Sequence, residues 1–132
     1  MGYLSREQIL AADDRTYADV PVPEWGGNVR VRSMTGRERD QLERSVMVEK
    51  KRGLKEVNME NFRAKIVALT VVDESGELLF TERDVRALGE KSSKAVARIA
   101  NKASELSAIT DDDVEEMTED FDEAPSDGSG SA

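Results

Sequence analysis

The uneven placement of charge along the chain constrains its fold more than any other feature. The 132 residues carry 28 acidic and 19 basic side chains, for a net charge of −9. Residues 110–132 contain ten of the acids and no base, which leaves residues 1–109 with 18 acids against 19 bases. A block of like charge is typical of a solvated tail or an interaction segment. The folded body is therefore predicted to be nearly neutral and to end near residue 109.

Composition narrows the classes of function open to this body. Hydrophobic residues make up 38% of the chain and aromatic residues 5%, which is enough for one thin core. The chain has no Cys and no His, so it lacks disulfides, thiolate chemistry and the commonest acid–base catalyst near neutral pH. No segment has the roughly 18 apolar residues of a membrane span, and no signal peptide is recognisable. We expect a cytoplasmic, non-enzymatic protein that binds no cofactor and no metal.

Residues 18–32 are predicted to form a β-hairpin. Two prolines in the first half exclude a helix and allow an edge strand at best. Residues 28–32 alternate apolar and charged side chains, as a half-buried strand does. The paired glycines Gly26 and Gly27 suit a turn that needs positive φ. Because an isolated hairpin is marginal in water, this one is expected to pack on helices.

Residues 5–12 can form one or two helical turns, and a longer helix is predicted from Thr35 to about Lys50. Thr35 and Glu38 have the spacing of a capping box, in which each side chain binds the backbone N–H of the other residue. The helix should be well exposed, because its apolar face is sparse; that face holds Leu42, Val46 and Met47. Residues 50–55 follow as a basic loop that contains a glycine stop.

Further helices are predicted wherever a polar cap precedes apolar residues spaced three and four positions apart. Asn58 caps one helix, which ends at Val71-Val72 before a turn and a short buried segment at 78–80. The apolar positions are Met59, Phe62, Ile66 and Leu69 in this helix and Val96, Ile99, Ala103 and Leu106 in a later one. The other caps are Thr81 for a short helix that stops near Gly89, Ser92 or Ser93 for the later helix, and Thr110 for a short acidic helix.

These elements define a mainly α fold with a small N-terminal β-hairpin (α+β), in which a helical body packs on the hairpin. The predicted divisions are an N-terminal segment at 1–15, the hairpin plus helical body at 16–109, a short acidic helix at 110–123 and a disordered acidic tail at 124–132. The tail is rich in Gly and Ser and has too little apolar surface to fold.

Three motifs have ordinary structural explanations. Residues 89–92 resemble the end of a phosphate-binding loop, but Asp84 stands where that loop needs a glycine. The acidic cluster at 111–116 lacks the glycine of a calcium loop. Acidic residues interleave with the basic ones between 30 and 55, which weakens the field that nucleic-acid binding requires. We therefore expect neither nucleic acid nor a membrane as a partner.

Several runs, taken in order, resemble the tail assembly chaperones of long-tailed (siphovirus-type) phages and prophages of actinobacteria. The runs are YLSREQILAA (3–12), VPVPEWGGNVRVR (20–32), TGRERD (35–40), VVDESG (71–76), LF (79–80), LGEKS (88–92) and residues 106–114. They cover most of residues 3–117. None is a catalytic motif, so the resemblance rests on their order and spacing.

The resemblance implies a protein that binds the tape measure protein in the host bacterial cytoplasm, keeps it soluble and promotes tail tube assembly. It also implies absence from the mature virion and a longer frameshifted form, of which this chain would be the short counterpart. The tail tube protein and that longer form are further expected partners, and self-association is left open. A tape measure protein is a long helix with apolar stripes, which the helices of this chain can match.

Two other functions stay open at this point. A structural tail or head–tail joining protein would remain in the virion, and an acidic regulator that mimics DNA would depend on residues 110–132. Trp25 is either a packing residue or a contact anchor. The candidate partner-binding residues are apolar or aromatic side chains of the turn and the helices: Trp25, Leu42, Val46, Val114, Met117 and Phe121.

Overall fold

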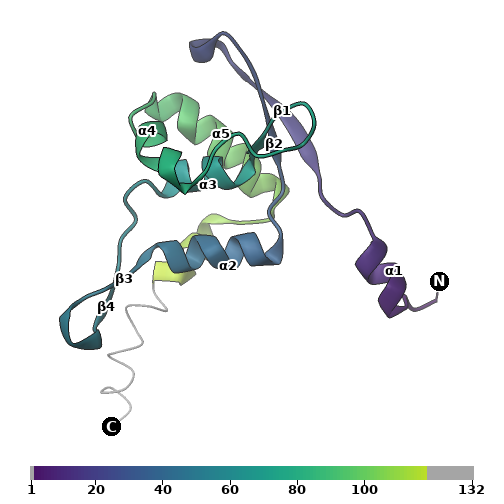
Figure 1. Cartoon of the computed structure of the whole chain (residues 1–132), viewed down its shortest axis with the longest axis horizontal. Helices are drawn as coiled ribbons and strands as arrows, with labels where there is room; N and C mark the ends of the chain where they lie inside the picture. The colour runs from purple at the N-terminus through teal and green to yellow at the C-terminus, as the bar shows by residue number, and fades with distance from the viewer. Residues whose placement is uncertain (1, 119–132) are drawn as a thin grey trace.

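The computed structural model describes residues 2–118. Its elements confirm the predicted fold class, because the chain is mainly helical with small antiparallel sheets (Figure 1). The predictions for residues 119–132, which include the tail and the end of the acidic helix, lie outside the described residues. No helix within residues 2–118 is long and apolar enough to cross a membrane.

The predicted hairpin is confirmed. Strand β1 (Tyr17–Val22) pairs antiparallel with β2 (Gly27–Arg32), and a 3₁₀ turn, η1 (Pro23–Trp25), joins them. Gly26 has a φ of 78°, the left-handed conformation that the paired glycines predicted. A third strand, β5 (Val71–Val72), pairs with β2 and gives the strand order β1-β2-β5. This strand was not predicted, because two residues at the end of a helical pattern show no period of two.

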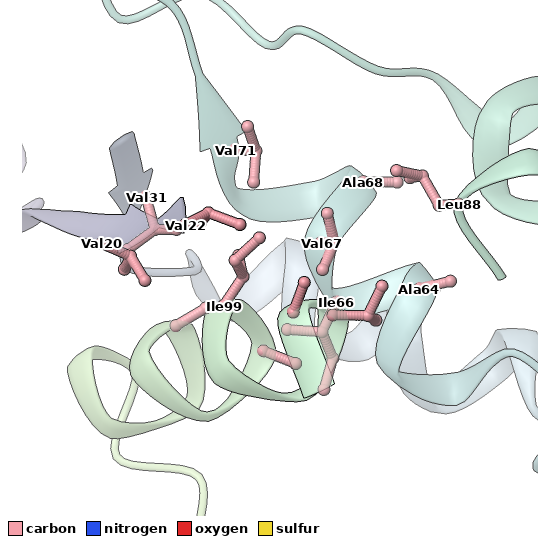
Figure 2. Close-up of a cluster of buried hydrophobic side chains, with 14 of the residues drawn as sticks. Val20, Val22, Val31, Ala64, Ile66, Val67, Ala68, Val71, Leu88 and Ile99 are labelled. Atoms are coloured by element: carbon pink, nitrogen blue, oxygen red, sulfur yellow. The ribbon is translucent and has the colours of Figure 1, made fainter. Parts of the chain in front are cut away.

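The core lies between this sheet and two helices, α3 (Phe62–Thr70) and α5 (Ser93–Leu106). Figure 2 shows Val20, Val22 and Val31 of the sheet directed toward Ile99 of α5. The small residues Ala95, Ala100 and Ala103 of α5 are also buried, which allows α3 to approach closely. Leu88 of helix α4 (Val85–Gly89) closes one end of the hydrophobic core.

Helix α2 (Gly36–Ser45) is joined to the sheet by a cluster around Glu38, which is only 8% exposed. Its carboxylate accepts a hydrogen bond from Thr35 N at 2.9 Å, which completes the predicted capping box. The same carboxylate accepts hydrogen bonds from Arg15 Nη2 at 2.9 Å and Arg32 Nη2 at 2.7 Å. One side chain therefore fixes the start of α2, the end of β2 and the segment that precedes β1.

The prediction for residues 46–55 is wrong. Helix α2 ends at Ser45, five residues before the predicted end, and no basic loop follows directly. Instead, β3 (Met47–Glu49) and β4 (Lys55–Val57) form a second hairpin around a 3₁₀ turn, η2 (Lys51–Gly53). Arg52 and Gly53 both have positive φ, which closes the turn, and Val57 pairs with Met47.

Two further boundaries differ from the prediction. The helix expected at Asn58 begins at Phe62, because the Asn58 side chain accepts from Glu60 N at 2.9 Å and forms a local turn instead. The segment at 78–80 is not fully buried, since Leu78 is 42% and Leu79 is 54% exposed. Its backbone bridges to β5, which leaves these side chains outside the core.

The remaining predicted caps are confirmed. Thr81 and Asp84 form a capping box at the 3₁₀ turn η3 (Glu82–Asp84), which leads into α4. The Ser92 side chain accepts from Ala95 N and caps α5. The first helix, α1 (Arg6–Ala11), is capped by Ser5 and has no buried residue.

The cluster around Glu38 leads to a prediction for stability. Glu38→Gln should lower the free energy of unfolding by about 2–4 kcal/mol, because Arg15 and Arg32 would lose their counter-charge while mostly buried. Urea denaturation measures the loss. Glu43→Gln is the matched control, since the Glu43 pair with Arg39 is more exposed and should change stability by less than about 0.5 kcal/mol. Equal losses in the two variants would contradict the account.

A candidate partner-binding groove between three helices

A groove of about 840 Å³ lies between α3, α5 and a last helix at residues 111–118. We call it the three-helix groove. Apolar side chains line its floor, and they come from all three helices or the turn between them: Met59, Phe62, Ile66, Ala100, Ile109 and Val114. An open groove with an apolar floor is the form of site into which an amphipathic helix binds.

The wall at residues 111–118 is positioned by a sharp reversal after α5. Ala108 has a φ of 56°, in the left-handed region, and Ile109 N donates back to Ser104 O at 2.8 Å. The left-handed residue and this hydrogen bond end α5 and direct the Ile109 side chain inward, where it is 7% exposed. Ser107 Oγ accepts from Met34 N at 2.9 Å, so the reversal is also attached to the segment that follows β2.

The last helix starts with the predicted cap at Thr110. Asp113 N donates to Thr110 Oγ1 at 3.1 Å, and Thr110 N donates to Asp113 Oδ2 at 2.8 Å. Hydrogen bonds from the backbone and hydroxyl of Thr110 lower the pKa of Asp113, and the nearby Arg39 guanidinium lowers it further. On the side toward α2, Met117 is 7% exposed and lines a small hollow with Arg39 and Met47. The helix is therefore held at its start and along one side.

The rim of the three-helix groove carries an excess of negative charge. Three carboxylates, those of Glu105, Asp111 and Glu115, stand around it against the single guanidinium of Arg63. A helical partner with basic residues beside its apolar stripe would complement this rim. Acidic partners would be disfavoured by the same charges.

A smaller hollow of about 390 Å³ lies beside the tip of the first hairpin, between Trp25, Phe80 and Leu88. The tip is held on α5 by a two-point ion pair, in which Arg98 donates to the Glu24 carboxylate at 2.8 and 2.9 Å. These hydrogen bonds lower the pKa of Glu24 from 4.5 to about 2. Trp25 is 38% exposed, so it both contributes to packing and presents an aromatic surface.

The structure does not bring the six sequence-derived candidates onto one surface. Val114 lines the three-helix groove, whereas Trp25 lies at the hairpin tip. Leu42 and Val46 are completely buried, so neither is available to a partner in this conformation. Met117 is buried against the α2 side. Phe121 lies outside the described residues.

Sequence reasoning named Val114 as a partner-binding candidate but did not single out the other apolar residues of the groove. Met59, Phe62 and Ile66 were predicted as one helical face from their spacing of three and four. Ile66 is buried, but Met59 and Phe62 are only partly covered. The spacing identified the face; only the packing of α3 shows that part of it stays open.

Three comparisons with known proteins bear on this fold. A family model described as "Phage tail assembly chaperone" matches residues 5–122. The chain is also similar to the solved structure of the tail assembly chaperone of bacteriophage HK97, with a TM-score of 0.55 and 20% sequence identity. That match covers 80% of this chain and 95% of the HK97 chain. No curated protein matches the sequence.

The ion pair at the hairpin tip leads to a prediction for pH dependence. Arg98→Met should raise the pKa of Glu24 from about 2 toward 4.5, because the donors that favour the carboxylate are lost. Since the folded-state pKa is the lower one, the pair stabilises the fold above about pH 4.5 and loses this effect as pH falls toward 2. An NMR titration of the Glu24 carboxyl carbon measures the shift. An unchanged pKa in the variant would contradict the assignment.

Proposed function

Because the chain belongs to the phage tail assembly chaperone family, we propose that it binds the tape measure protein of its phage. It acts in the host cytoplasm, keeps that partner soluble, promotes tail tube assembly and does not remain in the mature virion. The role is one of binding and not of catalysis, in keeping with the family. The observation that carries the proposal is the three-helix groove.

The groove supports this function through its shape and lining. An α-helix with its side chains is about 10–12 Å across, and a groove of about 840 Å³ bounded by helices can accept several turns of one face. Met59, Phe62 and Val114 offer partly uncovered apolar surface to that face. An elongated helical client with exposed apolar stripes is aggregation-prone because those stripes are uncovered. Covering one stripe segment would keep such a client in solution.

The charged rim adds selectivity. Glu105 stands on α5 and Glu115 on the last helix, and both line the groove. Client segments with Lys or Arg beside the apolar stripe would be steered to this rim and held in register. The proposal therefore includes a salt-sensitive association rate, because exposed charges are screened by ions.

The alternative of a structural tail or head–tail joining protein makes a different prediction about the virion. Mass spectrometry of purified particles should find no more than traces of peptides from residues 1–109. Abundant peptides would favour the structural alternative. A regulator that mimics DNA would depend on the acids of residues 110–132, so removal of residues 119–132, which hold five of those ten acids, should weaken it. Client binding through the groove should survive that truncation.

We also propose a siphovirus-type phage or prophage of an actinobacterium as the source, with a longer frameshifted product of the same gene and the tail tube protein as further partners. The residue runs described above support this origin. The gene neighbourhood tests it: a tail tube gene upstream, a very long reading frame downstream and a slippery heptamer near the stop codon. A neighbourhood without tail genes would contradict it.

Substitutions in the groove test the proposed binding site. Val114→Asp should weaken binding of the tape measure protein by at least about tenfold, because the contact would bury an unpaired charge. Co-expression followed by separation of soluble and insoluble fractions measures the effect on the client. Leu54→Asp is the matched control, since Leu54 is 61% exposed on the distant η2 hairpin and should leave the client soluble.

Val114 also packs against the core, so Val114→Asp could lower binding by disturbing the fold. A second variant separates these two effects. Reversing the rim with Asp111→Lys and Glu115→Lys changes two exposed residues and should weaken binding without altering thermal stability. If the client is equally soluble with the wild type, with both groove variants and with the control, the groove is not the binding site. If the wild type itself leaves the client insoluble, the chaperone proposal fails.

A further inference from the structure

The β3–β4 hairpin carries the most basic run of the chain. Residues 50–55 hold four bases and no acid: Lys50, Lys51, Arg52 and Lys55. Lys50 pairs with Glu56 at 3.6 Å, but within residues 2–118 the other three bases form no ion pair. All three are exposed, and the hairpin extends beyond the end of α2, away from the three-stranded sheet (Figure 1). It therefore presents unpaired positive charge.

One face of this hairpin is turned toward the last helix. Met47 pairs with Val57 in the register of β3 with β4, and Glu49 pairs with Lys55. Side chains alternate along a strand and paired residues share a face, so these four lie on the same side. Met47 lines a small hollow with Met117 of the last helix, yet it is 41% exposed. This side of the hairpin, together with the bases of its turn, is called the hairpin face; it has uncovered apolar surface beside the end of the described chain.

The sequence that follows the last helix complements the hairpin face. Phe121 has two acids on each side, which are Glu119, Asp120, Asp122 and Glu123. It stands four residues after Met117, which is itself three after Val114, so it continues the spacing of the apolar side chains of the last helix. An aromatic side chain flanked by carboxylates matches an exposed apolar side chain that lies near unpaired bases. We call residues 119–123 the acidic segment.

The acidic segment is within reach of the hairpin face. Thr118 is the last described residue, and Met117 before it already lies beside Met47. The three residues from 119 to 121 span at most about 11 Å, and β3, with its three residues, is about 10 Å long. A segment on so short a tether has an effective concentration in the millimolar range at its own hairpin. The hairpin of the same molecule is therefore favoured over that of another.

Two hollows of the body suit the acidic segment less well. The three-helix groove is lined by the carboxylates of Glu105, Asp111 and Glu115, which would repel it. A second hollow of about 590 Å³, between α2, α3 and the segment at 78–85, mixes cations with the carboxylates of Glu38 and Glu82. The hairpin instead offers three unpaired bases within five residues, and Lys55 is on the same face as the exposed Met47.

We propose that the acidic segment binds the hairpin face of its own molecule, with Phe121 on Met47 and the flanking carboxylates on the three unpaired bases. The contact holds the end of the last helix, as the cap at Thr110 holds its start. That helix is one wall of the three-helix groove, so the wall is stabilised from the side of Met117. Exposed ion pairs are individually weak and screened by salt, so the contact is reversible. It requires no client and stands or fails separately from the proposed function.

Paramagnetic NMR of the full chain tests the contact. The chain has no Cys, so Ala124→Cys carries a single spin label directly after the acidic segment. The amide signals of residues 51–55 should broaden, and dilution with chain that has neither label nor isotope should leave this broadening unchanged. In a mixture of spin-labelled chain with ¹⁵N chain that lacks the label, the hairpin signals should stay sharp, because the contact is within one molecule.

Variants of the acidic segment separate binding from mere nearness. Asp122→Lys with Glu123→Lys keeps the label site, so its remaining broadening is that of an unbound chain end. The ratio of bound to free segment should fall at least about fivefold, because attractive pairs become repulsive. Phe121→Ser should lower the same ratio through the lost apolar contact. High salt should lower it in the parent chain as well.

Variants of the hairpin give the reciprocal test. Lys51→Glu with Lys55→Glu reverses two exposed bases, so the fold should survive while the broadening falls. Arg83→Glu with Arg86→Glu makes the same change of charge at exposed positions of η3 and α4 and should keep the parent broadening. Combining the hairpin reversal with the reversal at residues 122–123 should restore the contact, because opposite charges face each other again.

Three results would overturn the proposal. The first is equal broadening of residues 51–55 in the parent chain and in the variant reversed at residues 122–123. The second is a hairpin reversal that acts no more strongly than its matched control. The third is broadening that appears between molecules in the mixed sample, since the acidic segment would then bind another copy.

Discussion

The carboxylate of Glu38 is the interaction on which the arrangement of this chain depends. It is almost buried and receives the Thr35 backbone and the guanidinium groups of Arg15 and Arg32. A buried charge is costly unless paired and hydrogen-bonded on several sides, so these groups hold their positions together. The start of α2, the end of β2 and the segment that precedes β1 are thereby set relative to one another.

Helix α3 contributes to two separate hollows. Phe62 and Ile66 line the three-helix groove, and Ala68 and Leu69 line a second hollow between α2, α3 and the segment at 78–85. The first has an acidic rim, whereas the second mixes the cations Arg32, Arg37 and Lys65 with the carboxylates Glu38 and Glu82.

Capping residues and turn residues predicted much of the fold, because each of them determines the conformation of only three or four neighbouring residues. The caps at Thr35, Thr81 and Thr110 form as predicted. The prolines and glycines of the first hairpin lie around its turn, as expected. The β3–β4 hairpin was missed, since nothing in the sequence marks the positive φ of Arg52. The site was harder to predict. Leu42 of α2 and Val46 at its C-cap are both completely buried, so neither is left for a partner.

The open groove could not be read from any one segment, because its walls come from residues far apart in the chain. Methyl NMR of the chaperone, titrated with a helical fragment of the tape measure protein, tests the central claim most directly. The methyl groups of Ile66, Ile109 and Val114, which line the three-helix groove, should shift, while those of Leu54 on the far hairpin stay unchanged. Shifts confined to methyl groups outside the groove, with Ile66, Ile109 and Val114 unaffected, would contradict the account.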